Sequence, residues 1–361
     1  MQELLGRISR LDPSASLGLR VIACFDELVV GKVGTRALLA AAASLAGCVA
    51  GCERATTGQV TRVGPDGTLV TAPPQAPEAS VTTDGARAWL ERAGEPLPND
   101  AIILERLALA LRIRHAEGEA LGDRGRHLRI LLGAEHPEAD RLAAATALRL
   151  ASGALHRVVA APLFAVWRGH PEGPEDVITT RHGAIHALVV PAELPELDAA
   201  PAGVGVAAHP AELHRSFGTA LVALRLTTPG EPLLLADDYA GLVELLADGE
   251  ETVAHAGADA EAMARACTPT WAHDTITVLL HTQTLREAAR ELGIHHSTLQ
   301  SRVVALTEAL GFDPTQGYGR VRLGVAHLVH RLRTSTVLEL PPPSTRAAAP
   351  PGAAQAVDRP G

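Results

Sequence analysis

The chain has 361 residues, of which 47% are hydrophobic and only 2% aromatic, and its formal net charge is −9. This length allows two or three domains, each with a core of aliphatic residues and alanine. The acidic balance argues against general nucleic-acid binding, and four cysteines in so long a chain indicate reduced thiols rather than a disulfide framework. No secretory signal is evident, and the apolar run 38–50 falls short of the roughly 20 residues of a membrane span. We therefore expect a cytoplasmic protein without membrane contact.

Residues from about 17 to 95 are typical of a mixed α/β unit. The residue patterns predict strands at 19–24, 47–52, 58–63 and 68–71, and helices at 36–45 and from Thr83 or Asp84 to Ala93.

A helix is predicted next, over residues 100–119. Ile103, Leu104, Leu107 and Leu111 form an apolar stripe along it. Such a stripe suits two partners equally well: the same helix of a second chain in a homodimer, or the helix's own domain.

Residues from about 125 to 250 alternate between strand and helix patterns, which indicates a second α/β domain. Strands are predicted at 127–132, 157–166, 182–190 and 203–207, and helices at 138–152 and from Pro210 onward. Residues 249–266 have the composition of a linker helix. The tail from residue 334 is proline-rich with little apolar content, and we expect it to be disordered.

The segment 284–306 predicts two short helices joined by a tight turn. Ala289 and Gly293 are four apart, as a helix-turn-helix requires at its helix crossing and turn. The first helix has an apolar face at 3–4 spacing, and the second repeats the pattern with Leu299, Val303 and Leu306.

The second helix begins with polar residues, and a helix that enters the major groove contacts base edges with its N-terminal residues. The candidates for DNA contact are His295, His296, Ser297, Thr298, Gln300, Ser301 and Arg302. The two histidines also suit capping or phosphate contact, and Arg302 suits a guanine edge or a phosphate. Residues 281–333 hold seven Arg and four Asp or Glu, a charge of +3, whereas the rest of the chain has 25 basic and 37 acidic residues, −12. A locally basic segment on an acidic body is typical of an attached DNA-binding domain.

This C-terminal region resembles the helix-turn-helix of PucR-type transcriptional regulators. The positions that match the family's pattern in register are Ala288–Leu292, His295, Thr298, Leu299, Arg302, Gly311, Asp313, Arg320, Leu323, Ala326 and Leu332. Two positions depart from it: Ser297 stands where Asn is usual, and Ser301 where Tyr is usual. The departures affect the base preference that the resemblance implies, but not the fold.

The middle region is similar to the degenerate GGDEF-like domain of the same family. Gly203–Ala207 and Ser216–Ala220 match its motifs, with Thr219 in place of the usual Glu. More weakly, the first region resembles a GAF-type sensor. An active diguanylate cyclase needs two carboxylates to hold Mg²⁺, but Ile185 and His186 stand where they would be required. We therefore expect no catalytic residues.

Histidine and cysteine pairs elsewhere are weak candidates for metal or redox sites. His182 and His186 have no third ligand in sequence, and His327 and His330 suit a phosphate contact or the surface. Cys48 and Cys52 lie in an apolar run, where cysteine behaves as a small hydrophobe. We expect no metal site and no cofactor.

These observations predict a multidomain α/β plus all-α protein that regulates transcription. The expected parts are a GAF-like sensor at 15–97, a connecting helix at 98–122, a degenerate GGDEF-like domain at 124–250, a helix-turn-helix domain at 268–333 and a disordered tail at 334–361. The expected partners are double-stranded promoter DNA, a second copy of the chain and a small-molecule effector at the N-terminal domain. Two alternatives stay open: an enzyme or nucleotide-binding protein of cyclic-dinucleotide metabolism with a DNA-binding appendage, and an interaction scaffold that has lost DNA contact.

Overall fold

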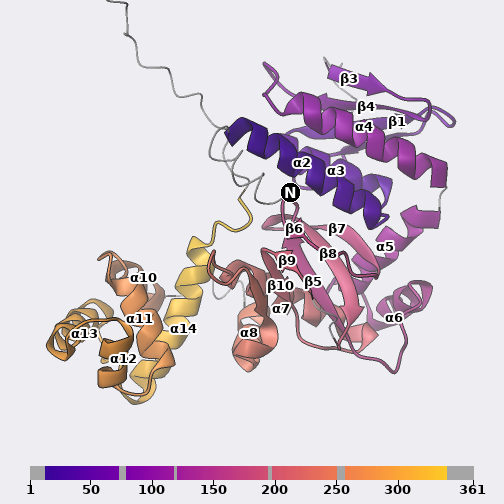
Figure 1. The fold of residues 1–361 in the computed structure, drawn as a ribbon. Helices are drawn as coiled ribbons and strands as arrows, with labels where there is room; N and C mark the ends of the chain where they lie inside the picture. Colours follow the sequence, from indigo (N-terminus) through magenta and orange to yellow (C-terminus); the bar gives the residue numbers. More distant parts are fainter. Residues whose placement is uncertain (1–12, 73–78, 118–119, 194–196, 250–256, 340–361) are drawn as a thin grey trace, which may run out of the picture.

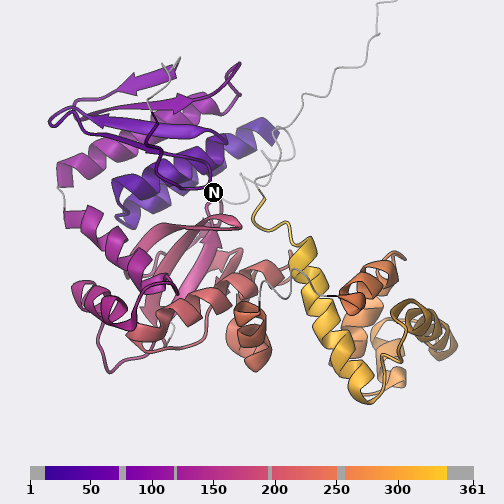
Figure 2. The same ribbon diagram turned by 180° about the vertical axis from the view of Figure 1, so that it is seen from behind.

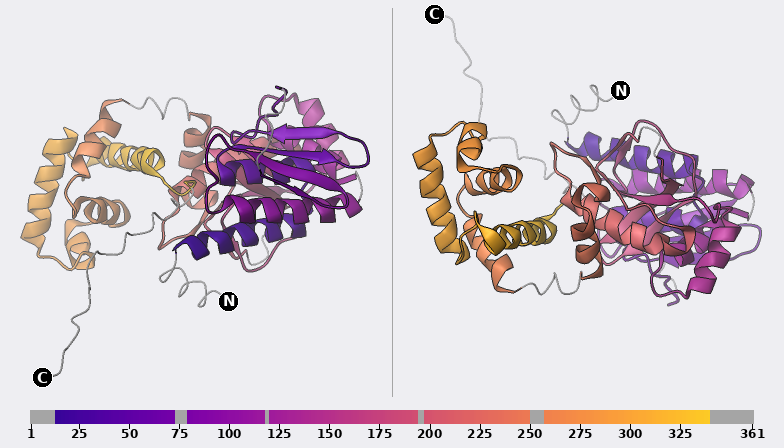
Figure 3. Two further views of the ribbon diagram at one scale, coloured as in Figure 1. Left: turned by 90° about the horizontal axis from the view of Figure 1, so that it is seen from above. Right: turned by 90° about the horizontal axis from the view of Figure 1, so that it is seen from below.

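The computed structural model describes residues 13–72, 79–117, 120–193, 197–249 and 257–339. Two α/β units form one body, and a lobe of helices stands beside it (Figures 1 and 3). The predicted mixture of α/β and all-α parts is therefore confirmed, whereas the GAF-like and GGDEF-like assignments stay predictions. No helix in the described ranges is long and apolar enough to cross a membrane.

The first unit packs two helices, α3 (Thr35–Ala46) and α4 (Asp100–Glu117), on an antiparallel sheet, and a third helix, α2 (Pro13–Val30), packs on those two. The strands are β1 (Val49–Arg54), β2 (Val60–Val63), β3 (Ala79–Thr82) and β4 (Ala86–Glu91). The strand order is β2-β1-β4-β3, with every neighbouring pair antiparallel.

Three predictions of local structure in this unit are wrong. The strand expected at 68–71 is reduced to a single bridge between Leu69 and Val63. The strand expected at 19–24 lies inside α2, because Val21, Phe25 and Leu28 recur at helical spacing and are all buried. The helix expected from residue 83 to 93 is instead β4, in which Ala86, Ala88 and Leu90 alternate into the core.

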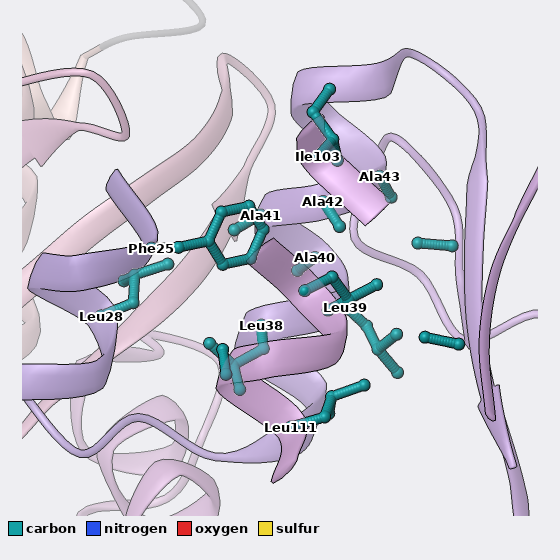
Figure 4. Packing of buried hydrophobic residues seen from close by; sticks show 14 of the residues in the cluster. Phe25, Leu28, Leu38, Leu39, Ala40, Ala41, Ala42, Ala43, Ile103 and Leu111 are labelled. Atoms are coloured by element: carbon teal, nitrogen blue, oxygen red, sulfur yellow. The ribbon is translucent and has the colours of Figure 1, made fainter. Parts of the chain in front are cut away.

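The core of the first unit surrounds α3, which is buried along nearly its whole length (Figure 4). Leu163 and Val177 of the second unit join the same cluster, so α3 also forms the contact between the two units. The apolar stripe of α4, from Ile103 to Leu111, is buried in this cluster. Of the two predicted partners, the apolar stripe of α4 therefore packs against its own domain. It is not exposed for pairing with a second copy of the chain.

The second unit is built on a five-stranded sheet of order β11-β10-β5-β8-β7, in which only β10 and β11 are parallel. Its strands are β5 (His156–Pro162), β7 (Glu175–Thr180), β8 (Gly183–Pro191), β10 (Ala202–Val204) and β11 (Leu233–Leu235), and β6 (Val166–Trp167) pairs with β9 (Ala199–Ala200) beside them. Its helices are α5 (Ala120–Leu132), α6 (Glu138–Ala147), the 3₁₀ turns η1 (Pro210–Glu212) and η2 (Ala236–Tyr239), α7 (Leu213–Leu226) and α8 (Gly241–Asp248). The strand expected at 127–132 is wrong, since Leu128, Leu131 and Leu132 form the buried face of α5.

The glycines of the 203–207 motif allow α7 to lie directly on the sheet. A Cβ at Gly203 would meet Ala220 O at 2.3 Å, and one at Gly205 would meet Ser216 O at 1.9 Å. In return, Ser216 Oγ accepts a hydrogen bond from Val158 N at 2.9 Å. This motif therefore serves helix–sheet packing.

The helical lobe contains α10 (Ala258–Ala266), α11 (Ala272–His281), α12 (Leu285–Glu291), α13 (His296–Leu310) and α14 (Gly317–Thr334). The linker helix expected at 249–266 needs correction: residues 250–256 lie outside the described residues, and α10 buries Ala262, Met263 and Ala266 in the core of the lobe.

One long helix, α14, joins the lobe to the α/β body (Figure 2). Leu328 and Leu332 of α14 pack with Val222 and Leu226 of α7. After α14, Val337 and Leu338 pack on the core of the second unit. Order therefore extends beyond residue 334, where the tail was expected to begin, and residues 340–361 lie outside the described residues.

Candidate nucleic-acid interface

The start of α12 is held by its capping residues. Thr284 Oγ1 accepts a hydrogen bond from Glu287 N at 3.2 Å, and Glu287 Oε2 accepts one from Gln283 N at 3.1 Å. The N–H of Glu287, which a helix leaves unsatisfied in its first turn, and the N–H of Gln283 just before the cap are thereby paired. This arrangement fixes where the first helix of the motif begins.

The turn between α12 and α13 depends on Gly293, whose φ is +63°. In this left-handed conformation Ile294 N donates to Ala289 O at 3.0 Å, which closes a Schellman-type C-cap. Ala289 is buried where the helices cross, as the four-residue spacing to Gly293 predicts. The tight turn predicted from the sequence is confirmed.

The apolar faces predicted for the two helices meet in one core. Ala288, Ala289, Leu299 and Leu306 are buried, and Leu285, Leu292 and Val303 pack against them. With this face turned inward, the polar residues at the start of α13 face outward.

Most of the candidate contact residues lie on that outward side. Ser297, Thr298, Gln300 and Ser301 are exposed. His295 is the N-cap of α13 and accepts a hydrogen bond from Ser297 N at its Nδ1 atom, at 3.3 Å. His296 is half-buried. The first two turns of α13 thus present hydroxyl, amide and imidazole groups together, which is the side-chain chemistry that reads base edges or holds phosphates.

Arg302 is placed differently from the other six. It is half-buried, its Nη1 atom donates to Thr275 Oγ1 at 3.1 Å, and its guanidinium carbon lies 5.2 Å from the Trp271 ring centroid. In this arrangement Arg302 attaches α13 to the segment that begins α11. It is not presented beside Gln300 and Ser301.

Two arginines on the first helix of the motif are not among the contact residues predicted from the sequence. Arg286 and Arg290 are both exposed and, four residues apart, share one face of α12. In helix-turn-helix complexes the first helix crosses the DNA backbone, so basic residues on it are suited to phosphates. Their spacing in the sequence was sufficient to find them.

The histidine pairs take structural positions. His327 is buried beside the His273 ring, and burial lowers its pKa to about 3, so the expected phosphate or surface role is wrong for this residue. His182 contacts Arg225, whereas His186 is hydrogen-bonded to Glu175 at 2.6 Å. Within the described residues, no three His, Cys, Asp or Glu side chains are grouped to hold a metal ion.

Comparison with known protein families identifies the C-terminal region. Residues 273–329 match the PucR C-terminal helix-turn-helix domain. The chain carries a PucR-type helix-turn-helix domain. The resemblance on which the sequence analysis relied is thereby confirmed for this region, and α11, α12 and α13 together with most of α14 are its helices.

No curated protein matches the chain. Among solved structures, the regulator of polyketide synthase expression from Bifidobacterium adolescentis matches at 16% identity, over 59% of this chain and 99% of the other, with a TM-score of 0.25.

Proposed function

We propose that the protein is a transcriptional regulator that binds double-stranded promoter DNA through its PucR-type domain. The observation that carries this proposal is the exposed polar start of α13, set on a capped and well-packed helix-turn-helix. Ser297, Thr298, Gln300 and Ser301 would contact base edges, and His295 and His296 would contact phosphates. Arg286 and Arg290 of α12 would add phosphate contacts.

The two α/β units are proposed to control this domain, the first as a GAF-like sensor over 15–97 and the second as a GGDEF-like domain over 124–250. The packing of α14 on α7 supports this, because a change in the second unit reaches the DNA-binding lobe through one continuous apolar contact. A signal acts only through its different affinity for two arrangements of that contact.

The second unit is proposed to act without catalysis. Ile185 is buried in β8, and His186 is buried against Glu175, so neither position offers a carboxylate for Mg²⁺. A homodimer is proposed as well, because one helix-turn-helix reads few base pairs and paired half-sites raise specificity. The buried stripe of α4 is not its interface, so another surface has to serve.

The proposal is tested by selecting bound duplexes from a randomised DNA library with the full-length protein. We expect enrichment of a two-fold symmetric site, and binding that weakens steeply with salt as counterions are released. Recovery of no enriched sequence, with no binding above that of an unrelated acidic protein, would favour the interaction scaffold.

A further inference from the structure

A cavity of about 760 Å³ lies where the two α/β units meet. Its walls come from α3, the β1–β2 strands, the end of α4, the start of α5 and β7. This volume is in the usual range for small-molecule sites, which often lie between domains. The elements that line it are at the far side of the α/β body from α13 (Figure 1), so the cavity is separate from the DNA-binding surface.

The walls of this cavity carry more positive than negative side chains. Three carboxylates line it, Asp84, Asp123 and Asp176, against five arginines: Arg36, Arg54, Arg112, Arg114 and Arg129. Guanidinium groups are the preferred partners of carboxylates and phosphates, because their planar donors match both geometries. The excess of guanidinium over carboxylate favours an anionic occupant.

Several of these arginines are held in place at the wall. Arg114 is only 3% exposed and donates from Nη2 to Val29 O at 3.2 Å. Arg36 donates from Nη2 to Gly67 O at 3.4 Å, and Arg129 forms an ion pair with Asp176.

The positive groups of this wall affect one another's pKa. Burial, followed by the nearby positive charge of Arg129, lowers the pKa of Arg36. Burial and the charge of Arg54 lower the pKa of His115 in the same wall. A bound anion would offset this crowding of positive charge.

One acceptor at the same wall lacks a donor. Asp176 is fully buried, and its Oδ1 atom has no hydrogen-bond partner in the described part of the chain. Burial raises the pKa of this carboxyl to about 6. The approach of Asp176 to α5 requires Gly125, since a Cβ there would lie 2.6 Å from Asp176 Oδ2. An occupant with a hydroxyl or amine could complete this network.

We infer that this cavity binds a small organic polyanion, one with two or more carboxylate or phosphate groups and a hydrogen-bond donor. It is the effector of the regulator, a role that rests on the proposed function. Because the walls belong to both units, such a ligand would bridge them and favour one arrangement of the units. The sensor would then read its signal at the junction of the two units, and not within the first unit alone.

The test is titration calorimetry of the full-length protein with citrate as the carboxylate probe and inorganic pyrophosphate as the phosphate probe. We expect saturable binding of at least one probe, and the identity of that probe decides between the two anion classes. Arg112→Gln should weaken that binding by about tenfold, as expected for one lost charge-assisted contact. Arg112 is exposed, so its replacement leaves the fold intact. Arg87→Gln, at an exposed arginine of β4 outside the cavity, is the matched control and should bind as the wild type does.

No saturable binding of either probe, or equal binding by the Arg112→Gln and wild-type proteins, would overturn the inference. DNA binding is measured on the same samples, so the two proposals fail separately. DNA binding without anion binding contradicts the polyanion site alone, and anion binding without DNA binding contradicts the proposed function alone. A probe that binds the cavity and leaves DNA affinity unchanged would remove the effector role, because coupling between two sites is reciprocal.

Discussion

The guanidinium of Arg302 lies over the ring of Trp271, 5.2 Å from its centroid, and donates to Thr275 at 3.1 Å. These contacts join the second helix of the motif to the start of α11. A cation–π contact of this kind contributes about 0.5–1 kcal/mol, and a hydrogen bond adds a similar amount. Arg302 therefore sets the position of α13 in the lobe, whereas its neighbours Gln300 and Ser301 are exposed.

Replacing Arg302 by Ala should destabilise the helical lobe by about 1–2 kcal/mol, because both contacts are lost. Hydrogen exchange of the α11 and α13 amides should accelerate by a corresponding factor. Gln300→Ala, two residues earlier and exposed, is the control and should exchange as the wild type does. Unchanged exchange in Arg302→Ala would mean that the side chain is not held as described.

Replacing Gly205 by Ala should destabilise the second unit by about 1–3 kcal/mol, as overpacking does in tight cores. The added methyl would lie 1.9 Å from Ser216 O, so α7 has to move off the sheet. Urea denaturation measures the change. Gly169→Ala, an exposed position with no atom within 4 Å of the added carbon, is the matched control. Equal stability of the two variants would show that α7 does not need this close approach.

A partly buried chain of ionisable groups makes the α2–β7 contact sensitive to pH. His170 bonds to Glu175 at 2.9 Å and to Glu27 of α2 at 3.0 Å, and these carboxylates raise the pKa of His170 to about 9. Although burial opposes it, hydrogen bonds from His170 and His186 hold the pKa of Glu175 below its usual value.

Because the pKa of His170 is higher in the folded state, its stabilising effect is complete below about pH 6.5 and is lost as the pH rises through about 9. Thermal unfolding from pH 6 to pH 10 should show this loss in the wild type. His170→Gln keeps a polar side chain without the charge, and should be less stable near neutral pH with a flatter profile. Parallel profiles for the two proteins would contradict the role given to His170.

The contact between α14 and α7 should be separable from DNA binding. Leu332→Ala removes a side chain that is 2% exposed, and such losses in a core cost about 2–5 kcal/mol. We expect faster hydrogen exchange along α7 and the end of α14, with DNA affinity retained. Val325→Ala, on the same helix but 40% exposed, should leave the exchange of α7 unchanged. If the α7 amides exchange no faster in Leu332→Ala than in Val325→Ala, α14 does not connect the lobe to the body.

The helix-turn-helix was predictable because every signal for it is local. Thr284, Gly293 and the apolar faces lie within about two dozen residues, and each has a specific role in a cap, a turn or a core. The errors at 19–24 and 127–132 have one cause: a short apolar run fits a buried strand and a buried helix equally well. In both segments a wider window shows the 3–4 spacing that decides for a helix.

The role of Arg302 and the basic cavity could not be predicted in this way. Thr275 lies 27 residues before Arg302 in the sequence, and Trp271 lies still earlier. Only the packing of α11 on α13 brings these residues together. The five cavity arginines, from Arg36 to Arg129, lie in four elements of the two units. The sequence spacing of these residues does not predict that they meet, because only the folded structure places them around one cavity.

The central claim, that the start of α13 reads DNA, is tested most directly by Gln300→Ala. Fluorescence anisotropy would compare a duplex selected by the wild-type protein with a scrambled duplex at fixed salt. Glu308→Gln, exposed near the other end of the same helix, is the control. We predict that Gln300→Ala loses about 1–3 kcal/mol of discrimination between the two duplexes, while Glu308→Gln keeps the wild-type discrimination. If Gln300→Ala discriminates as well as the wild type, and replacing Ser297, Thr298 and Ser301 together by Ala also changes nothing, this surface does not read DNA.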